Sequence, residues 1–356
     1  MKRTFDRRLS FGPAKIVSIV ILLAFIVIIA VFVNRNNNAM KPYSVNTVAM
    51  DTIVSITLYG KDAGDTVKEL TTKINRLEGL FSVTDKNSEI YALNNACGES
   101  VNVSPDVANL IKGAVSLGRS TNGKLDITIY PVLKAWGFTT GDYRIPKESE
   151  LQELLTHVGL ENIAIKDRNI SLLNGAMIDL GAVAKGYTAD VLTDMLDNSK
   201  VSAAIISLGG NIQTFGNKPD NSAWQIGIKN PETDNTNLGI LSLKGTNAVV
   251  TSGAYERFFA GEDGNTYGHI IDPFTGHPVE SEYMSVTIVA GRGMGVLADA
   301  FSTACFMMEK EEIMKLYSEM GGFEVIAYSK NGEIYLTPGI KDFFTPEAGF
   351  KVNILN

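Results

Sequence analysis

A mostly apolar run from Ile16 to Val33 divides this chain into parts that must fold in different surroundings. The run carries no charged side chain and is long enough to span a bilayer as one helix. Residues 1–15 before it are rich in Lys and Arg, and a basic flank of this kind stays in the cytoplasm. We therefore expect a cytoplasmic segment at 1–15, a single transmembrane anchor at 16–33, a linker at 34–44 and a folded domain at 45–356 on the extracytoplasmic side of the cell membrane. A cleaved signal peptide is the alternative interpretation of the apolar run.

Composition excludes some classes of function for the folded domain. The 356 residues carry a formal net charge of −7 and no basic stripe, so no nucleic acid is expected as a partner. The chain has two cysteines and three histidines, too few for a typical Cys/His metal site. A bound metal would need oxygen ligands, which indicates Mg²⁺ or Ca²⁺. Cys305 lies in an apolar run and is expected to be a buried free thiol.

Strand and helix patterns alternate through the folded domain. Apolar residues recur at helical spacing at 65–81, 104–120, 147–157, 188–196 and 295–308. Alternating or continuous apolar runs predict strands at 47–58, within 123–138, in a hairpin at 163–178, and at 203–207, 224–228, 238–243, 248–251, 285–290, 323–328 and 333–336. Gly261 to Gly264 and Asn331-Gly332 are typical of β-hairpin turns. These patterns predict a single mixed α/β domain of the α+β class, and they leave open whether it is built from two similar halves.

Small residues surround one carboxylate and one lysine between Asp179 and Asp190. The segment follows the apolar run 176–178, which has the pattern of a strand end, and it leads into the helix predicted at 188–196. Backbone N–H groups at a strand-to-helix turn can point at an anion, and the helix N-terminus favours negative charge. Asp179 and Lys185 would add one negative and one positive group. The alternative is a tight turn that needs glycine for its geometry alone.

Asp299 and Thr303 are four residues apart in the helix predicted at 295–308, so they share one face. Their neighbours are small or apolar, and a carboxylate in such surroundings needs a partner, for which a hard cation is suited. The alternative is that Asp299 helps to cap the helix while Thr303 bonds back to a carbonyl.

His269 stands at a predicted strand end, beside the turn Asp272 to Gly276. A histidine in this position can act as a general base. The alternative is a satisfied structural histidine, with Asp272 serving as an ordinary turn residue.

The tripeptide Trp136-Gly137-Phe138 offers two flat apolar faces around a glycine. Such a pair could hold a ring such as a flavin, and core packing is the alternative.

Several motifs occur together in one order along 45–340, and their joint order is more specific than any one of them. They are Ala49-Met50-Asp51-Thr52; Ser82, Ser88-Glu89-Ile90 and Asn94; Trp136-Gly137-Phe138; Asp179-Leu180-Gly181 with Ala184-Lys185-Gly186-Tyr187; Leu208-Gly209-Gly210-Asn211; Thr251-Ser252-Gly253; His269-Ile270-Ile271-Asp272-Pro273 with Thr275-Gly276; and Ala298-Asp299-Ala300 with Thr303-Ala304. In this order the chain resembles the FAD:protein FMN transferases, the ApbE-like flavin transferases.

The resemblance implies a magnesium-dependent transfer within a domain of the ApbE-like α+β type. FAD would be cleaved at its pyrophosphate, FMN would be joined to a threonine or serine hydroxyl of an extracytoplasmic acceptor protein, and AMP would leave. By the same resemblance, Asp299, Thr303 and the backbone carbonyl of Ala182 would hold Mg²⁺, and His269 would be the base. The residues implied for FAD binding are Met50, Thr84, Trp136, Gly137, Phe138, Asp179, Lys185 and Ile271.

Two other functions use the same predicted site. Water in place of the protein hydroxyl would make the enzyme a pyrophosphatase that splits FAD into FMN and AMP. A non-catalytic FAD-binding module would have no need for the Asp299–Thr303 pair.

Overall fold

The computed structural model describes residues 41–253 and 255–355. The basic segment 1–15 and the anchor predicted at 16–33 lie outside this part of the chain. Within it, no helix is both long enough and apolar enough to cross a membrane.

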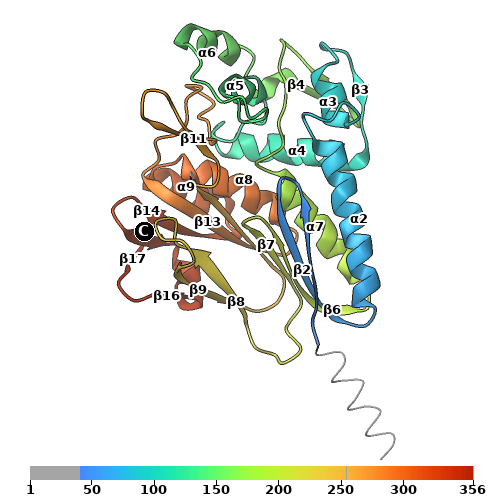
Figure 1. Cartoon of the computed structure of the whole chain (residues 1–356), viewed down its shortest axis with the longest axis vertical. Helices are drawn as coiled ribbons and strands as arrows, with labels where there is room; N and C mark the ends of the chain where they lie inside the picture. Colours follow the sequence, from blue (N-terminus) through green and yellow to red (C-terminus); the bar gives the residue numbers. More distant parts are fainter. Residues whose placement is uncertain (1–40, 254, 356) are drawn as a thin grey trace, which may run out of the picture.

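A large, mostly antiparallel sheet runs through the described chain and joins strands from both of its halves (Figure 1). In spatial order its nine strands are β1 (Tyr43–Ala49), β2 (Thr52–Gly60), β6 (Val201–Leu208), β7 (Asn211–Phe215), β10 (Asn247–Gly253), β13 (Tyr283–Gly291), β14 (Phe323–Ser329), β15 (Glu333–Leu336) and β17 (Lys351–Ile354). Only β15 and β17 pair in parallel among these strands of the described chain.

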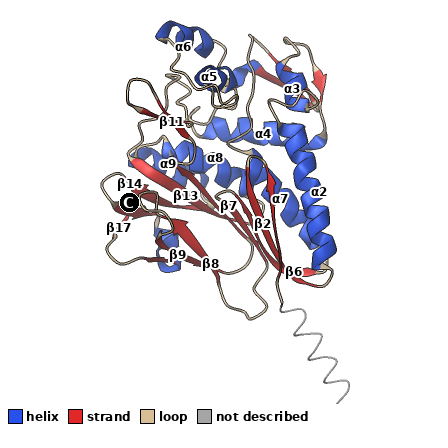
Figure 2. Ribbon diagram, viewed as in Figure 1, coloured by secondary structure: helices blue, strands red, loops and turns tan. Residues whose placement is uncertain are grey.

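Helices cover one face of this sheet, as Figure 2 shows. They are α2 (Ala63–Phe81), α4 (Pro105–Ser120), α7 (Ala184–Asp197), α8 (Gly295–Phe306) and α9 (Lys310–Met320). Residues of one strand alternate between the two faces, so Ala248 and Val250 pack toward the helices while Val249 packs the other way. The opposite face is covered by a small sheet of β16 (Phe344–Pro346), β9 (Asn237–Leu243) and β8 (Trp224–Lys229). The core is therefore layered, with the helices on one side and the small sheet on the other.

A third group of elements lies beyond the helical layer, in the upper part of Figure 1. It comprises α3 (Glu89–Asn94), α5 (Tyr130–Trp136), α6 (Glu148–Leu155), the 3₁₀ turn at Leu160–Asn162, the sheet β3 (Val101–Asn102), β5 (Asn169–Leu172) and β4 (Ile163–Lys166), and the hairpin β11 (Phe258–Ala260) and β12 (Thr266–Gly268). A second 3₁₀ turn spans Pro338–Phe343.

The mixed α+β class and most predicted elements are confirmed. Ser104 caps α4, the helix expected at 104–120, since its side chain accepts a hydrogen bond from the Val107 N–H. The hairpin of β4 and β5 turns at 167–168, and β11 and β12 flank the predicted glycine turn. Cys305 is buried and free, also as expected.

Three predicted strands are wrong, each for a local reason. The strand at 47–58 is two strands, because Met50 and Asp51 both have positive φ (52° and 58°) and close a hairpin between β1 and β2. The strand expected within 123–138 is replaced by α5, which has Pro131 in its first turn. The run 176–178 is not a strand, and Met177 makes only an isolated bridge to Ile129.

Candidate active site

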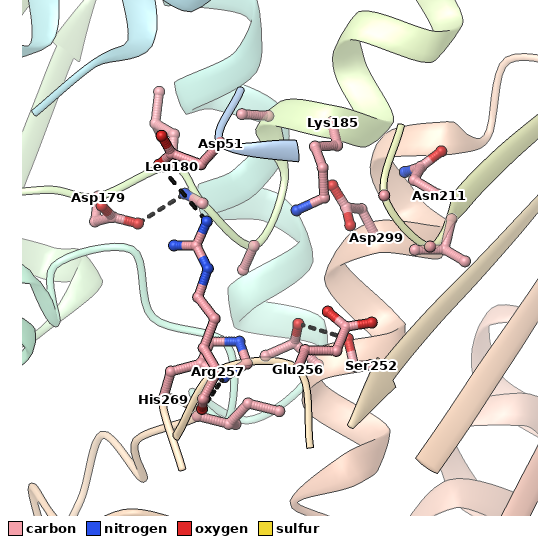
Figure 3. Close-up of a pocket in the computed structure, with 18 of the residues that line it drawn as sticks. Asp51, Asp179, Leu180, Lys185, Asn211, Ser252, Glu256, Arg257, His269 and Asp299 are labelled. Carbon is pink, nitrogen blue, oxygen red and sulfur yellow. Dashed lines mark hydrogen bonds and ion pairs between the residues drawn. The ribbon is translucent and has the colours of Figure 1, made fainter. Parts of the chain in front are cut away.

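A cavity of about 910 Å³ opens where the β1–β2 turn, the start of α7, the ends of β7 and β10 and one face of α8 meet (Figure 3). This volume is at the upper end of the range for small-molecule sites, roughly 300–1,000 Å³. The cavity brings together most of the residues predicted from the sequence: Met50, Thr84, Phe138, Asp179, Ala182, Lys185, His269, Ile271, Asp299 and Thr303. Trp136 and Gly137 do not line it.

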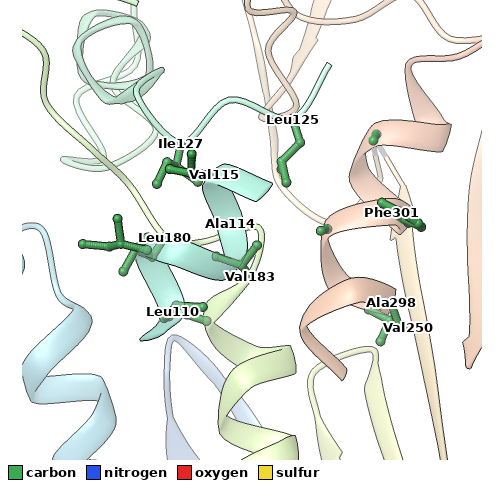
Figure 4. Packing of buried hydrophobic residues seen from close by; sticks show 14 of the residues in the cluster. Leu110, Ala114, Val115, Leu125, Ile127, Leu180, Val183, Val250, Ala298 and Phe301 are labelled. Atoms are coloured by element: carbon green, nitrogen blue, oxygen red, sulfur yellow. The ribbon is translucent and has the colours of Figure 1, made fainter. Parts of the chain in front are cut away.

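The turn that carries Asp179 is held rigidly from behind. Leu180 and Val183 are fully buried and pack with Leu110 of α4 in the core (Figure 4). The Asp179 N–H donates to the Ile127 carbonyl at 2.8 Å, and the Gly181 N–H donates to Asp179 Oδ1 at 2.7 Å. The turn is therefore fixed before a ligand arrives, as an anion-binding turn needs to be.

An asparagine on α3 holds the residue that leads into this turn. The Asn94 side-chain amide donates to the Ile178 carbonyl at 2.9 Å and accepts from the Ile178 N–H at 2.7 Å. These two bonds give the Ile178 N–H and carbonyl the partners that a neighbouring strand would otherwise supply. They explain how 176–178 stays ordered without joining a sheet.

Asp299 lies at a very close contact between α7 and α8. A Cβ on Gly186 would stand 2.2 Å from the Gly295 carbonyl oxygen, so only glycine permits this approach. The contact lets the Gly186 N–H donate to Asp299 Oδ2 at 2.8 Å. Asp299 is 4% exposed, and burial raises the pKa of its carboxyl while the Lys185 ammonium opposes that rise. The carboxylate thus sits at the N-terminus of α7, where the helix dipole stabilises negative charge.

The capping alternative for Asp299 does not describe this helix. Asp190 of α7 takes that role, since its two carboxylate oxygens accept from the N–H groups of Gly295 (2.9 Å) and Val296 (3.1 Å). Thr303, one turn after Asp299, lies with its Oγ1 3.3 Å from Ser252 Oγ. Asp299 and Thr303 therefore both present oxygen to the cavity from one face of α8.

Charged side chains of both signs line the cavity, among them Asp51, Lys185, Glu256 and Arg257. Lys185 makes no ion pair with any described residue, and its ammonium lowers the pKa of the Asp299 carboxyl against the effect of burial (Figure 3). Arg257 Nη2 lies 3.6 Å from Asp51 Oδ2, and both residues line the cavity (Figure 3). Burial raises the pKa of Glu256, whose carboxylate also faces the cavity. Glu256 and Arg257 were missed from the sequence, where only their position after Ser252-Gly253 could have indicated them.

His269 is held as a neutral imidazole with one nitrogen free. Its Nδ1 lies 3.1 Å from the Arg257 carbonyl oxygen, which can only accept, so Nδ1 carries the proton. Nε2 therefore keeps its lone pair. Burial lowers the pKa of His269 to about 4, with the cations Arg257 and Lys185 acting in the same direction. The residue can accept a proton at neutral pH, which a general base requires.

The aromatic tripeptide divides between the cavity and the core. Phe138 lines the cavity, whereas Trp136 is fully buried and its Nε1–H donates to the Gly276 carbonyl at 2.8 Å. Gly137 ends α5 with φ of 85°, a conformation that favours glycine. The core-packing alternative thus describes Trp136, which supports the turn after His269 from behind.

Sequence comparison places this chain among proteins of one kind. The family model described as the ApbE family matches residues 50–327. An FAD:protein FMN transferase from Klebsiella pneumoniae is 30% identical over 316 residues, which cover 87% of this chain and 96% of that protein. A protein of the same name from Escherichia coli is 25% identical over 299 residues, which cover 81% of this chain and 84% of that protein.

Solved structures show the same similarity in three dimensions. The ApbE protein of Thermotoga maritima matches with a TM-score of 0.78 and 31% identity, over 85% of this chain and 99% of that protein. The flavin transferase ApbE of Vibrio cholerae matches with a TM-score of 0.73 and 26% identity, over 85% and 99% of the two chains.

Proposed function

The chain belongs to the ApbE family, and from this membership we propose that it is a transferase that cleaves FAD and attaches FMN to an acceptor protein. The bond formed is a phosphoester to a threonine or serine hydroxyl, and AMP is released. The observation that carries this proposal is that one cavity joins an oxygen-rich pair on α8, a lysine that has no ion pair among the described residues and a neutral histidine. The names of the relatives, FAD:protein FMN transferase, support the same reaction.

The residues divide the reaction between them. Lys185 binds the pyrophosphate, because its ammonium faces the cavity from the start of α7. The acceptor oxygen attacks the phosphorus of the FMN half, the bond from that phosphorus to the bridging oxygen breaks, and the bridging oxygen leaves on AMP. The acceptor proton passes to Nε2 of His269. Such a transfer depends on positioning and charge neutralisation more than on covalent catalysis.

Asp299, Thr303 and the Ala182 carbonyl would hold Mg²⁺ in this cavity. The described residues hold no group of three or more His, Cys, Asp or Glu side chains that could cage a metal. One carboxylate with neutral oxygens suits Mg²⁺, which usually keeps several waters and binds substrate phosphates. When bound, Mg²⁺ neutralises charge that develops on the phosphate oxygens.

The decisive test uses the full chain in detergent with FAD, Mg²⁺ and a candidate acceptor. We expect AMP in solution and a covalently fluorescent acceptor band after denaturing electrophoresis. AMP and free FMN without a labelled band would indicate the pyrophosphatase alternative instead. FAD binding with no AMP would indicate a non-catalytic module.

Replacing Lys185 or Asp179 by alanine is expected to weaken FAD binding without unfolding the domain. Neither side chain packs in the core, and both face the cavity from a rigid turn. Loss of a hydrogen bond that involves a charged group costs roughly 1.5–3 kcal/mol, about a ten- to hundredfold rise in Kd; the partner is a phosphate for Lys185 and a hydrogen-bond donor of FAD for Asp179, because a carboxylate repels phosphate. Flavin fluorescence titration measures the affinity, and a thermal melt checks folding. Wild-type affinity in both variants would place FAD elsewhere.

The location of the domain is also a proposal, based on the basic flank and the apolar run at 16–33. Protease added to spheroplasts is expected to remove the domain while a cytoplasmic marker protein stays intact. Full protection of the domain until the membrane is lysed would reverse the proposed orientation.

A further inference from the structure

Asn211 lines the cavity from a fixed position. It is the first residue of β7 and follows a tight turn in which Gly209 and Gly210 have φ of 54° and 85°. A Cβ on Gly209 would stand 2.0 Å from Thr52 Oγ1, so this turn is closely packed against β2. Asn211 is 1% exposed and lines the cavity.

The side-chain amide of Asn211 lacks the partners that a buried amide needs. Neither Nδ2 nor Oδ1 has a hydrogen-bond partner of ordinary geometry among the described residues. Leaving such a group unsatisfied destabilises the folded state, and an apolar side chain would fill the same space without that loss. Packing alone therefore does not account for an asparagine here.

The group beside this amide is the carboxylate of Asp299 (Figure 3). Burial raises the pKa of Asp299, and the Lys185 ammonium, the Gly186 N–H and the Asn211 amide each oppose that rise. The Gly186 N–H donates to Oδ2 at 2.8 Å, and the Lys185 N–H also acts on this carboxylate. The carboxylate is thus held by backbone N–H groups at the start of α7 and adjoined by a side-chain amide that has a donor to spare.

Gln213 offers an internal comparison. It lies two residues further along β7, so its side chain is on the same face of the strand. It is also 1% exposed, and both of its amide atoms lack a partner among the described residues. Gln213 does not line the cavity and is not among the groups that act on Asp299. The two residues share burial and chemistry and differ in their distance from the carboxylate.

We propose that Asn211 is a positioning residue, whose amide donates to the Asp299 carboxylate and orients it toward a divalent cation. This inference rests on the proposed function, because it assumes that Asp299 is a cation ligand. Groups that hydrogen-bond to a metal-binding carboxylate fix its orientation, and removing one typically weakens metal binding about 10- to 100-fold.

The test compares Asn211→Leu with Gln213→Met in the full chain, without FAD. Each substitution replaces a buried, unpartnered amide with an apolar side chain of similar size. The unfolding temperature in EDTA is the folding reference for each variant: it is expected to equal or exceed that of wild type in Gln213→Met, where only unsatisfied polar atoms are removed, and to fall in Asn211→Leu, where the Asp299 carboxylate loses a donor. The Mg²⁺ concentration at the midpoint of the Mg²⁺-dependent rise in unfolding temperature should increase about 10- to 100-fold in Asn211→Leu. It should stay at the wild-type value in Gln213→Met.

Each result has a distinct meaning. A wild-type Mg²⁺ midpoint in Asn211→Leu, or an equal shift in both variants, would overturn the positioning role. If wild type itself shows no Mg²⁺-dependent stabilisation, the metal site of the proposed function fails and the positioning role fails with it. Asn211→Ser, which is smaller and still polar, replaces the leucine variant if that protein does not fold, and the same midpoint decides. Excess Mg²⁺ should restore FAD cleavage in the Asn211 variant, a rescue that a general loss of structure would not allow.

Discussion

Asp299→Ala is expected to abolish FAD cleavage and protein flavinylation together. Asp299 is the only charged side chain among the ligands proposed for Mg²⁺, and it is buried at the N-terminus of α7. Without the cation, negative charge on the pyrophosphate oxygens would be left uncompensated in the transition state. Loss of such a group typically costs several kcal/mol, which is on the order of a thousandfold in rate. AMP release and the fluorescent acceptor band measure the two halves of the reaction.

Asp190→Asn provides the matched control for this prediction. Asp190, which is partly buried, and Asp299, which is buried, are both carboxyls at the α7–α8 contact, but Asp190 binds backbone N–H groups at the start of α8. Its substitution should lower the unfolding temperature and leave the Mg²⁺ dependence of the rate unchanged. Asp299→Ala should change the Mg²⁺ dependence of the rate without lowering the unfolding temperature, and part of the rate should be regained in excess Mg²⁺. Full Mg²⁺-dependent activity in Asp299→Ala would contradict the metal assignment on α8.

Sequence periodicity predicted the parts of the fold whose signals are local. The helices at 65–81 and 295–308 have long apolar stripes, and Ser104-Pro105 is a strong start signal for α4. The shared face of Asp299 and Thr303 follows from helical spacing alone, and the structure places both at the cavity. Local rules suffice where the residues that decide an outcome are neighbours in the chain.

The same rules failed where a turn or a helix depended on unusual residues. Met50 and Asp51 adopt positive φ without glycine, so the hairpin between β1 and β2 looked like one strand. The helix α9 was missed because its residues are mostly polar and its start is marked only by the capping box of Glu309 and Glu312. These features have signals, but the signals are weaker than the apolar pattern around them.

Contacts between distant segments could not be predicted at all. Gly186 was interpreted as part of an anion-binding turn, whereas its lack of a side chain serves the approach of Gly295. Trp136 was expected beside FAD, and the structure buries it against the turn after His269. Asn211 appeared only as one letter of a motif, because its neighbour Asp299 is far away in the sequence. Each of these roles depends on the distance between two residues that are far apart in the sequence, and local sequence patterns do not give that distance.

His269→Ala is expected to slow FMN transfer about a hundred- to ten-thousandfold while FAD still binds in the presence of Mg²⁺. The substitution removes the proton acceptor for the incoming hydroxyl and leaves Asp299 and Thr303 in place. His277→Ala is the matched control, since His277 follows in the same segment but lies outside the cavity and contacts Glu148. That variant should transfer FMN at the wild-type rate. Single-turnover transfer with saturating FAD measures the chemical step in both.

The pH profile of the wild-type enzyme tests the same assignment from its protonation state. A histidine accepts a proton only while it is neutral, so the rate should fall as the pH drops through its pKa. An exposed histidine would place that fall near pH 6.5, but burial lowers the pKa of His269 to about 4. The transfer rate should therefore show no loss from this group between about pH 8 and pH 5, and then fall near pH 4. In His269→Ala this acidic limb should disappear from the residual rate.

Two other outcomes would contradict part of this assignment. If the wild-type rate falls near pH 6.5 and that fall vanishes in His269→Ala, His269 is the base but its pKa is not lowered by burial. Transfer at the wild-type rate in His269→Ala would make the histidine structural, because the lone pair on Nε2 would then have no part in moving the proton.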